Sequence, residues 1–205
     1  MLGLMEMREE RTHVLRPREE PARAFTYRDY LSWGEDVHVE LIDGTPHMMA
    51  APTLWHQRMV RKLFRQVDEF LAGKTCEAFT APVDVRLFPE GDESDTVVVQ
   101  PDVLVVCDAG KLSDGRACKG APDFVVEVVS EGSRGKDFGE KRMLYEKAGV
   151  REYWIVDKDR VCKYVLIDGM YRETAYRLDK NLEIGVDALA GCVIGFRDIV
   201  EASLP

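Results

Sequence analysis

Hydrophobic positions along the chain follow a helical period in two segments, and a capping pattern marks a third, shorter helix. From residue 53 to residue 71, apolar side chains recur every three or four positions, which predicts an amphipathic helix ending near Gly73. The same spacing over residues 137–148, closed by Gly149, predicts a second helix. A capping-box pattern predicts a short helix over residues 27–33.

Apolar runs between these helices predict β-strands. Asp43-Gly44 and Asp168-Gly169 each separate two strand-like runs and predict hairpins. Further strands are expected beyond Asn181. The other predicted strands lie in segments 76–88, 96–107, 122–130 and 151–157, with a polar loop over 109–121.

This order of elements predicts an α/β fold. Strands on both sides of a helix along the chain imply a mixed β-sheet flanked by helices, here with additional β-hairpins. We expect residues 1–24 to form a flexible N-terminal tail and residues 25–205 to form a single domain.

The composition is that of an ordinary globular chain. Hydrophobic residues make up 45% and charged residues 32%, which excludes disordered and fibrous proteins. The apolar runs are too short to cross a membrane and the N-terminus lacks the apolar core of a secretion signal, so we expect a cytoplasmic protein. The net charge of −9 argues against coating nucleic acid through bulk charge but leaves room for a local basic patch.

Neither the cysteines nor the histidines show a ligand pattern. The five cysteines are widely separated and include no CxxC pair, so we interpret them as reduced thiols that pack in the interior. The four histidines, among them His56, have no ligand spacing either, which is typical of structural or exposed residues. The sequence therefore predicts no structural zinc site and no disulfide framework.

Three charged residues interrupt apolar patterns and are candidates for chemistry. Glu127 lies inside a strand that is apolar enough to be buried on both faces, where an unpaired carboxylate is costly. Asp102 begins a strand after Pro101 and would lie near Glu127 if the two strands pair. Lys141 shares a helical face with apolar residues. Two carboxylates close together favour a Mg²⁺ or Mn²⁺ site.

Each candidate also has a purely structural interpretation. Glu127 fits a hydrogen-bonded core carboxylate, Asp102 fits ordinary turn chemistry, and Lys141 fits a side chain whose stem extends to water. Glu40 is a weaker fourth candidate, because exposed glutamates are common in strands.

Five segments of the chain form a distinctive series: VELIDGTPHMM, a helix beginning His56-Gln57, VVQPDVLVV, PDFVVEVVS and KDFGEKRMLYEKAGVREYWIVD. In this order they resemble a bacterial family of putative restriction endonucleases in the PD-(D/E)XK nuclease superfamily. The resemblance covers residues 25 to 180 and implies a restriction-endonuclease-like fold and endonuclease activity.

The resemblance also implies which residues are catalytic. The Pro-Asp pair ending at Asp102 matches the PD element, and Glu127 matches the acidic residue of the second half-motif. The standard motif places lysine two residues later, where this chain has Val129. In this family the lysine is thought to lie on the following helix, where Lys141 matches, and Glu40 aligns with a recurrent glutamate.

On these assignments we expect a Mg²⁺ (or Mn²⁺) ion held by Asp102, Glu127 and the backbone carbonyl of Val128. Lys141 would assist the attacking water, and Glu40 would hold a second metal ion or orient the lysine. The expected reaction is hydrolysis of phosphodiester bonds, with DNA the expected substrate.

Local basic clusters would hold the nucleic acid, although a solvated helix face explains each cluster as well. Cutting both strands of a duplex would favour a homodimer. The expected nucleic-acid-binding residues are Arg58, Arg61, Lys62, Arg65, Arg134, Lys136 and Arg142.

Three other functions fit the same sequence. The main alternative is a non-cleaving nucleic-acid-binding or regulatory dimer module that keeps the nuclease fold. The others are a structural dimerising protein and a metal-dependent hydrolase of small phosphoesters. Binding that weakens steeply with salt would favour the nuclease over the small-ester hydrolase.

Overall fold

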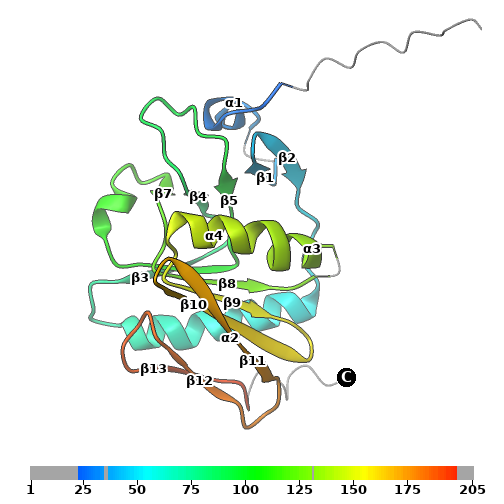
Figure 1. Ribbon diagram of the computed structural model, residues 1–205, viewed down its shortest axis with the longest axis vertical. Coiled ribbons are helices and arrows are strands. Elements are labelled where there is room, and N and C mark those ends of the chain that lie inside the picture. The colour runs from blue at the N-terminus through cyan, green and yellow to red at the C-terminus, as the bar shows by residue number, and fades with distance from the viewer. Residues whose placement is uncertain (1–22, 35–36, 131, 198–205) are drawn as a thin grey trace, which may run out of the picture.

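The computed structural model describes residues 23–34, 37–130 and 132–197 (Figure 1). The predicted tail, residues 1–24, lies outside the described residues except for Arg23 and Ala24. The helical segments are α1 (Tyr27–Leu31), α2 (Leu54–Leu71), the 3₁₀ turn η1 (Ala109–Leu112), α3 (Arg134–Lys136), the π-helical turn η2 (Asp137–Lys141) and α4 (Arg142–Ala148).

The largest sheet has six strands, and its pairing is mixed, as predicted. Strands β8 and β9 are parallel, and the other neighbours in this sheet are antiparallel. Its order is β11 (Met170–Arg177), β10 (Arg160–Ile167), β9 (Glu152–Val156), β8 (Phe124–Val128), β6 (Val103–Val106) and β3 (Glu77–Thr80).

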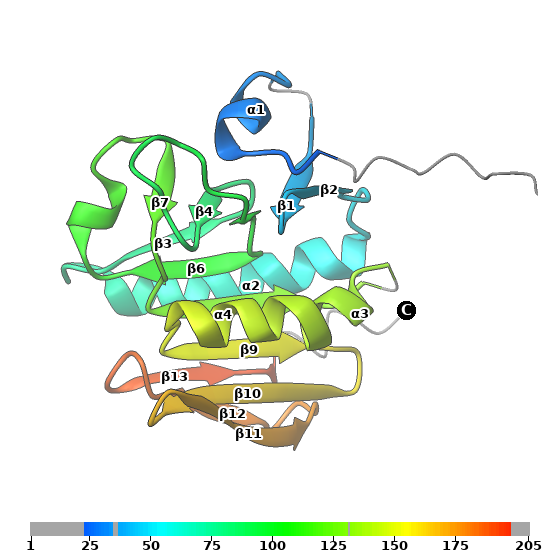
Figure 2. The same ribbon diagram turned by 45° about the horizontal axis from the view of Figure 1, so that its top comes forward.

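Two smaller sheets lie at opposite ends of this layer (Figure 2). The predicted hairpins at Asp43-Gly44 and Asp168-Gly169 are both confirmed, the first within the five-stranded sheet. That sheet has the order β2 (Thr45–Met48), β1 (Val39–Ile42), β5 (Val98–Val99), β4 (Asp84–Arg86) and β7 (Ala117–Lys119). The third sheet is a hairpin of β12 (Glu183–Val186) and β13 (Cys192–Gly195).

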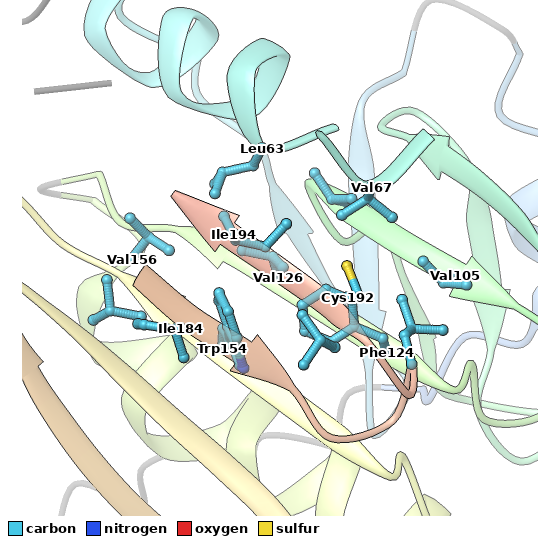
Figure 3. Packing of buried hydrophobic residues seen from close by; sticks show 14 of the residues in the cluster. Leu63, Val67, Val105, Phe124, Val126, Trp154, Val156, Ile184, Cys192 and Ile194 are labelled. Carbon is cyan, nitrogen blue, oxygen red and sulfur yellow. The ribbon is translucent and has the colours of Figure 1, made fainter. Parts of the chain in front are cut away.

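Helices cover both faces of the six-stranded sheet. The apolar face of α2, with Leu63 and Val67, packs against the β8 side chains Val126 and Phe124, and β12 and β13 close the same core from the side (Figure 3). On the opposite face, Tyr145 of α4 packs in a second core with the alternate residues of β6, β8 and β9. The central strands β6, β8 and β9 are therefore buried on both sides, as their continuous apolar runs predict, whereas the edge strand β11 is largely exposed.

Two predicted strand segments each divide into strands of different sheets. Segment 76–88 gives β3 and β4, separated at Ala81–Pro82, and segment 96–107 gives β5 and β6, separated at Pro101. Because proline has no N–H to donate to a ladder, both breaks fall at prolines. The break at Pro82 was not predicted, whereas the break at Pro101 agrees with the strand expected to begin at Asp102. The turn between β5 and β6 links the two sheets.

Two other boundaries differ from the sequence prediction. The loop predicted over residues 109–121 contains η1 and β7, because β7 pairs in parallel with the distant strand β4. The helix predicted over residues 137–148 begins at Arg134, where backbone bonds to Ser133 start the helical turns, and it passes through the π turn η2.

The prediction that all cysteines are reduced was wrong for one pair. Cys76 and Cys107 form a disulfide with Cα atoms 3.9 Å apart. Glu77 and Val106 form the outermost pair of the antiparallel β3–β6 ladder, and the two cysteines occupy the next position outward on each strand. Strand pairing therefore places the two thiols opposite each other. The other cysteines are free and buried. Among the described residues, no helix has the length and apolarity needed to span a bilayer.

Candidate active site

The four predicted catalytic residues come from four separate segments. Glu40 lies on β1 of the five-stranded sheet, and Asp102 lies in the turn that leads from β5 into β6. Glu127 lies on β8, and Lys141 ends the π turn η2. Strands β6 and β8 pair antiparallel with Val103 opposite Val126, so the start of β6 lies beside the carboxyl end of β8.

Lys141 is the centre of the cluster. Its Nζ lies 2.7 Å from Oε1 of Glu40 and 2.7 Å from Oε1 of Glu127. Asp137, one turn earlier, has its Oδ1 4.0 Å from the same nitrogen. The Lys141 side chain is only 5% exposed, so its stem does not carry the charge to water. The structure therefore contradicts the interpretation of Lys141 as a lysine that extends into solvent.

Burial and charge act in opposite directions on these groups. Burial disfavours the charged form of Lys141, but the attraction of Glu127, Glu40 and Asp137 outweighs it and raises the pKa of Lys141 well above its usual value. Burial raises the pKa of Glu127 well above its usual value, against the attraction of Lys141. Burial likewise raises the pKa of Asp137 to about 6. The lysine is therefore protonated at neutral pH.

The carboxylates of this cluster are held by further hydrogen bonds. Tyr145, fully buried on α4, donates from its hydroxyl to Oε1 of Glu127 at 2.8 Å. The backbone N–H of Gln100 donates to Oε1 of Glu40 at 3.0 Å. The hydrogen-bonded core interpretation of Glu127 is thus satisfied in part, but its partners include a buried ammonium ion, which a merely structural carboxylate does not need.

Asp102 joins the cluster through the backbone of β8. Its Oδ2 accepts a hydrogen bond from the N–H of Val128 at 2.7 Å and lies 3.1 Å from Nε2 of His56. Thr53 caps the first turn of α2 by accepting from the N–H of His56 at 3.3 Å, which fixes the position of the histidine. Two donors on one oxygen fix the plane of the Asp102 carboxylate.

His56 is a site residue that sequence reasoning missed. Burial lowers its pKa, but the hydrogen bond and charge of Asp102 outweigh this, with a further contribution from the Val128 backbone, and the net pKa is raised. Its Nδ1 is buried without a hydrogen-bond partner among the described residues. The only signal in the sequence was its place at the start of a segment that carries the family resemblance.

The donor set suits a divalent cation of the Mg²⁺ type, although it is not a complete cage. The buried carboxylates of Glu40, Glu127 and Asp137 surround one ammonium group, and the charge of Asp102 is close enough to act on Glu127. The cluster therefore has more acidic groups than basic ones. All are oxygen donors, which Mg²⁺ and Mn²⁺ prefer. In the described part of the chain, no three His, Cys, Asp or Glu side chains are grouped to hold a metal ion. Backbone oxygen or water would have to complete the coordination.

The predicted nucleic-acid-binding residues of α2 divide into two pairs. Arg58 and Arg61 are exposed and line a groove along the helix. Lys62 and Arg65 do not line it, and Arg65 has its NH1 3.9 Å from Oε1 of Glu69.

The basic residues near the catalytic lysine have intramolecular partners. Arg134 forms an ion pair with Asp157. Arg142 has its NH1 3.8 Å from Oε2 of Glu146. Lys136, the last residue of α3, is half-buried. A role for these residues in binding nucleic acid stays a prediction.

The sequence and the fold are both similar to those of known nuclease-like proteins. The model of the Uma2 family, described as putative restriction endonuclease, matches residues 27–196. A crystal structure of a putative nuclease belonging to DUF820 from Anabaena variabilis has a TM-score of 0.69 at 15% identity, over 88% of this chain and 99% of that chain. This likeness confirms the predicted fold class. No curated protein matches the chain. The chain therefore belongs to the Uma2 family of putative restriction endonucleases.

Proposed function

We propose that the protein is a metal-dependent endonuclease that hydrolyses phosphodiester bonds, with DNA as the expected substrate. Family membership and fold support a nuclease. The observation that carries the proposal is the buried contact of Lys141 with Glu127 and Glu40, next to Asp102. A buried ion pair is seldom kept for stability alone, because apolar residues of the same volume serve as well or better.

In this proposal Asp102, Glu127 and the backbone carbonyl of Val128 hold a Mg²⁺ or Mn²⁺ ion. The hydrogen bonds described above are accepted by Oδ2 of Asp102 and Oε1 of Glu127, so the ion would bind the other oxygen of each carboxylate. When bound, such an ion polarises the scissile phosphate and lowers the pKa of a coordinated water.

Lys141 acts in this proposal as a positioned cation and hydrogen-bond donor. Because its pKa is raised, it holds its proton at neutral pH. It donates to the attacking water or to a phosphate oxygen and stabilises the negative charge of the transition state. Glu40 keeps the ammonium group in place from the β1 side, so we favour the orienting role for Glu40 over a second metal site.

The experiment is incubation of the purified protein with plasmid, single-stranded DNA and RNA, each with Mg²⁺, Mn²⁺ or EDTA. We expect cleavage that requires a divalent ion and is lost in Lys141→Met and Asp102→Asn. Lys163→Met is the matched control, because Lys163 is also a buried lysine, paired with Glu152 and Asp187 at 3.4 and 3.1 Å in another part of the sheet.

If no substrate is cut with any metal ion, the proposal fails and the non-cleaving binding module replaces it. A homodimer and a cytoplasmic location stay predictions.

A further inference from the structure

A groove of about 380 Å³ lies between helix α2 and strand β3. Strand β3 is the edge of the six-stranded sheet, so this side of the groove is not covered by another strand. The helix contributes Leu54, Arg58, Arg61 and Phe64, and the strand contributes Thr80.

Both walls of the groove begin beside the candidate active site. On the helix, His56 touches Asp102 and precedes Arg58 by two residues. On the strand, Thr80 pairs with Val103, the residue after Asp102, and the N–H of Ala81 donates to the Asp102 carbonyl at 3.3 Å. The groove therefore lies beside the turn that contains Asp102.

The two active-site residues nearest the groove are also the most exposed ones of the site. The side chains of His56 and Asp102 are 12% and 13% exposed, whereas those of Glu40, Glu127 and Lys141 are each 5% exposed. A substrate must approach the cluster where its side chains are accessible. Asp102 and His56 are the most accessible of these five, and both lie next to residues of the two elements that line the groove.

The groove combines two unpaired cations with apolar surface. Arg58 and Arg61 are exposed, and neither side chain has an ion pair or hydrogen bond within the described residues. Leu54 is 73% exposed, and Phe64 is half-buried. Guanidinium groups next to flat apolar surface suit a strand of nucleic acid, whose phosphates are anionic and whose bases stack on apolar and aromatic side chains.

We propose that this groove binds one strand of nucleic acid beside the scissile phosphate, with Arg58 and Arg61 on its phosphates and Phe64 and Leu54 against a base. The inference rests on the proposed function, since it places the substrate of the same site. It also explains how a chain with a net charge of −9 holds a polyanion: the contact is local.

The test is binding of a fluorescein-labelled single-stranded 20-mer of DNA, measured by fluorescence anisotropy in EDTA so that no cleavage occurs. The variant pair is Arg58→Gln with Arg61→Gln. The control pair, Arg172→Gln with Arg177→Gln, removes the same charge from exposed arginines of β11, at the opposite edge of the six-stranded sheet. Each protein is titrated from low to high salt, and its melting temperature is checked.

We expect the groove pair to weaken binding by about tenfold or more at low salt and to reduce the slope of log K against log salt by about 1.4, the value for two phosphate contacts to a single strand. The control pair should change binding by less than about threefold, through general electrostatics alone.

Three results would overturn the inference: no binding by the wild type, equal losses in the two pairs, or displacement of the DNA by polyglutamate as readily as by unlabelled DNA. The last result would mean that the groove accepts any polyanion. Absence of cleavage with every metal ion, together with the expected difference between the pairs, would refute the proposed nuclease activity and support the groove as a binding surface.

Discussion

Replacing Lys141 with methionine tests the active-site geometry most directly. Methionine keeps a long unbranched side chain and removes the ammonium group, so Glu40 and Glu127 lose a partner at 2.7 Å each. Removing one member of a buried ion pair costs about 3–5 kcal/mol, because the remaining charge is left uncompensated. Domains of this size are stable by about 5–15 kcal/mol, so we expect a folded but clearly destabilised variant.

The loss should depend on pH, with a defined sign. Burial already raises the pKa of Glu127, and without Lys141 the attraction that opposes this rise is gone. A carboxyl group whose folded pKa lies above its unfolded value, about 4.3, binds more protons when folded. Stability then falls as pH rises between the unfolded and folded pKa values. We therefore expect Lys141→Met to lose more stability at pH 8 than at pH 5.

Urea unfolding in EDTA, followed by tryptophan fluorescence at both pH values, measures this loss. Lys163→Met is the control, because Lys163 is buried and also donates to the carbonyl of Gly185 at 2.6 Å. The control should lose stability but keep cleavage, whereas Lys141→Met should lose about 100-fold or more in cleavage rate. A loss of stability below about 1 kcal/mol in Lys141→Met, or cleavage at the wild-type rate, would refute the reasoning, since breaking a buried pair costs more than that.

Three further substitutions or treatments probe the surroundings of the site. His56→Leu removes a donor from Asp102 and should weaken Mn²⁺ binding, measured by calorimetry, by about 10- to 100-fold, with partial recovery in His56→Gln. An unchanged Kd would show that the contact does not orient the carboxylate. Tyr145→Phe removes a hydrogen bond to the carboxylate of Glu127 and should lower the free energy of unfolding in urea by about 1.5–3 kcal/mol. No change in that free energy would mean that this bond does not form. Reduction of the Cys76–Cys107 disulfide should lower the free energy of unfolding by about 3–4 kcal/mol, because the bond restricts a loop of 31 residues in the unfolded chain. Identical urea curves with and without dithiothreitol would indicate that the pair is already reduced.

Local patterns in the sequence are enough to predict the type of most elements and to single out the residues with unusual chemistry. The apolar stripe of α2 and the two Asp-Gly turns are local patterns, and a local period is enough to choose between helix, strand and hairpin. Glu127 and Lys141 stood out because a charge in an apolar pattern has to find a partner. Each of these two residues is the partner of the other. The family resemblance also points to both of them.

Contacts between distant segments, in contrast, are visible only in the folded protein. The contact between His56 and Asp102 joins residues 46 positions apart, and the Cys76–Cys107 bond depends on the pairing of β3 with β6. The breaks at Pro82 and Pro101 each divide one strand segment between two sheets. None of these contacts leaves a local period in the sequence. They depend on how whole layers pack and pair, which is fixed by the burial of many side chains at once rather than by neighbours along the chain.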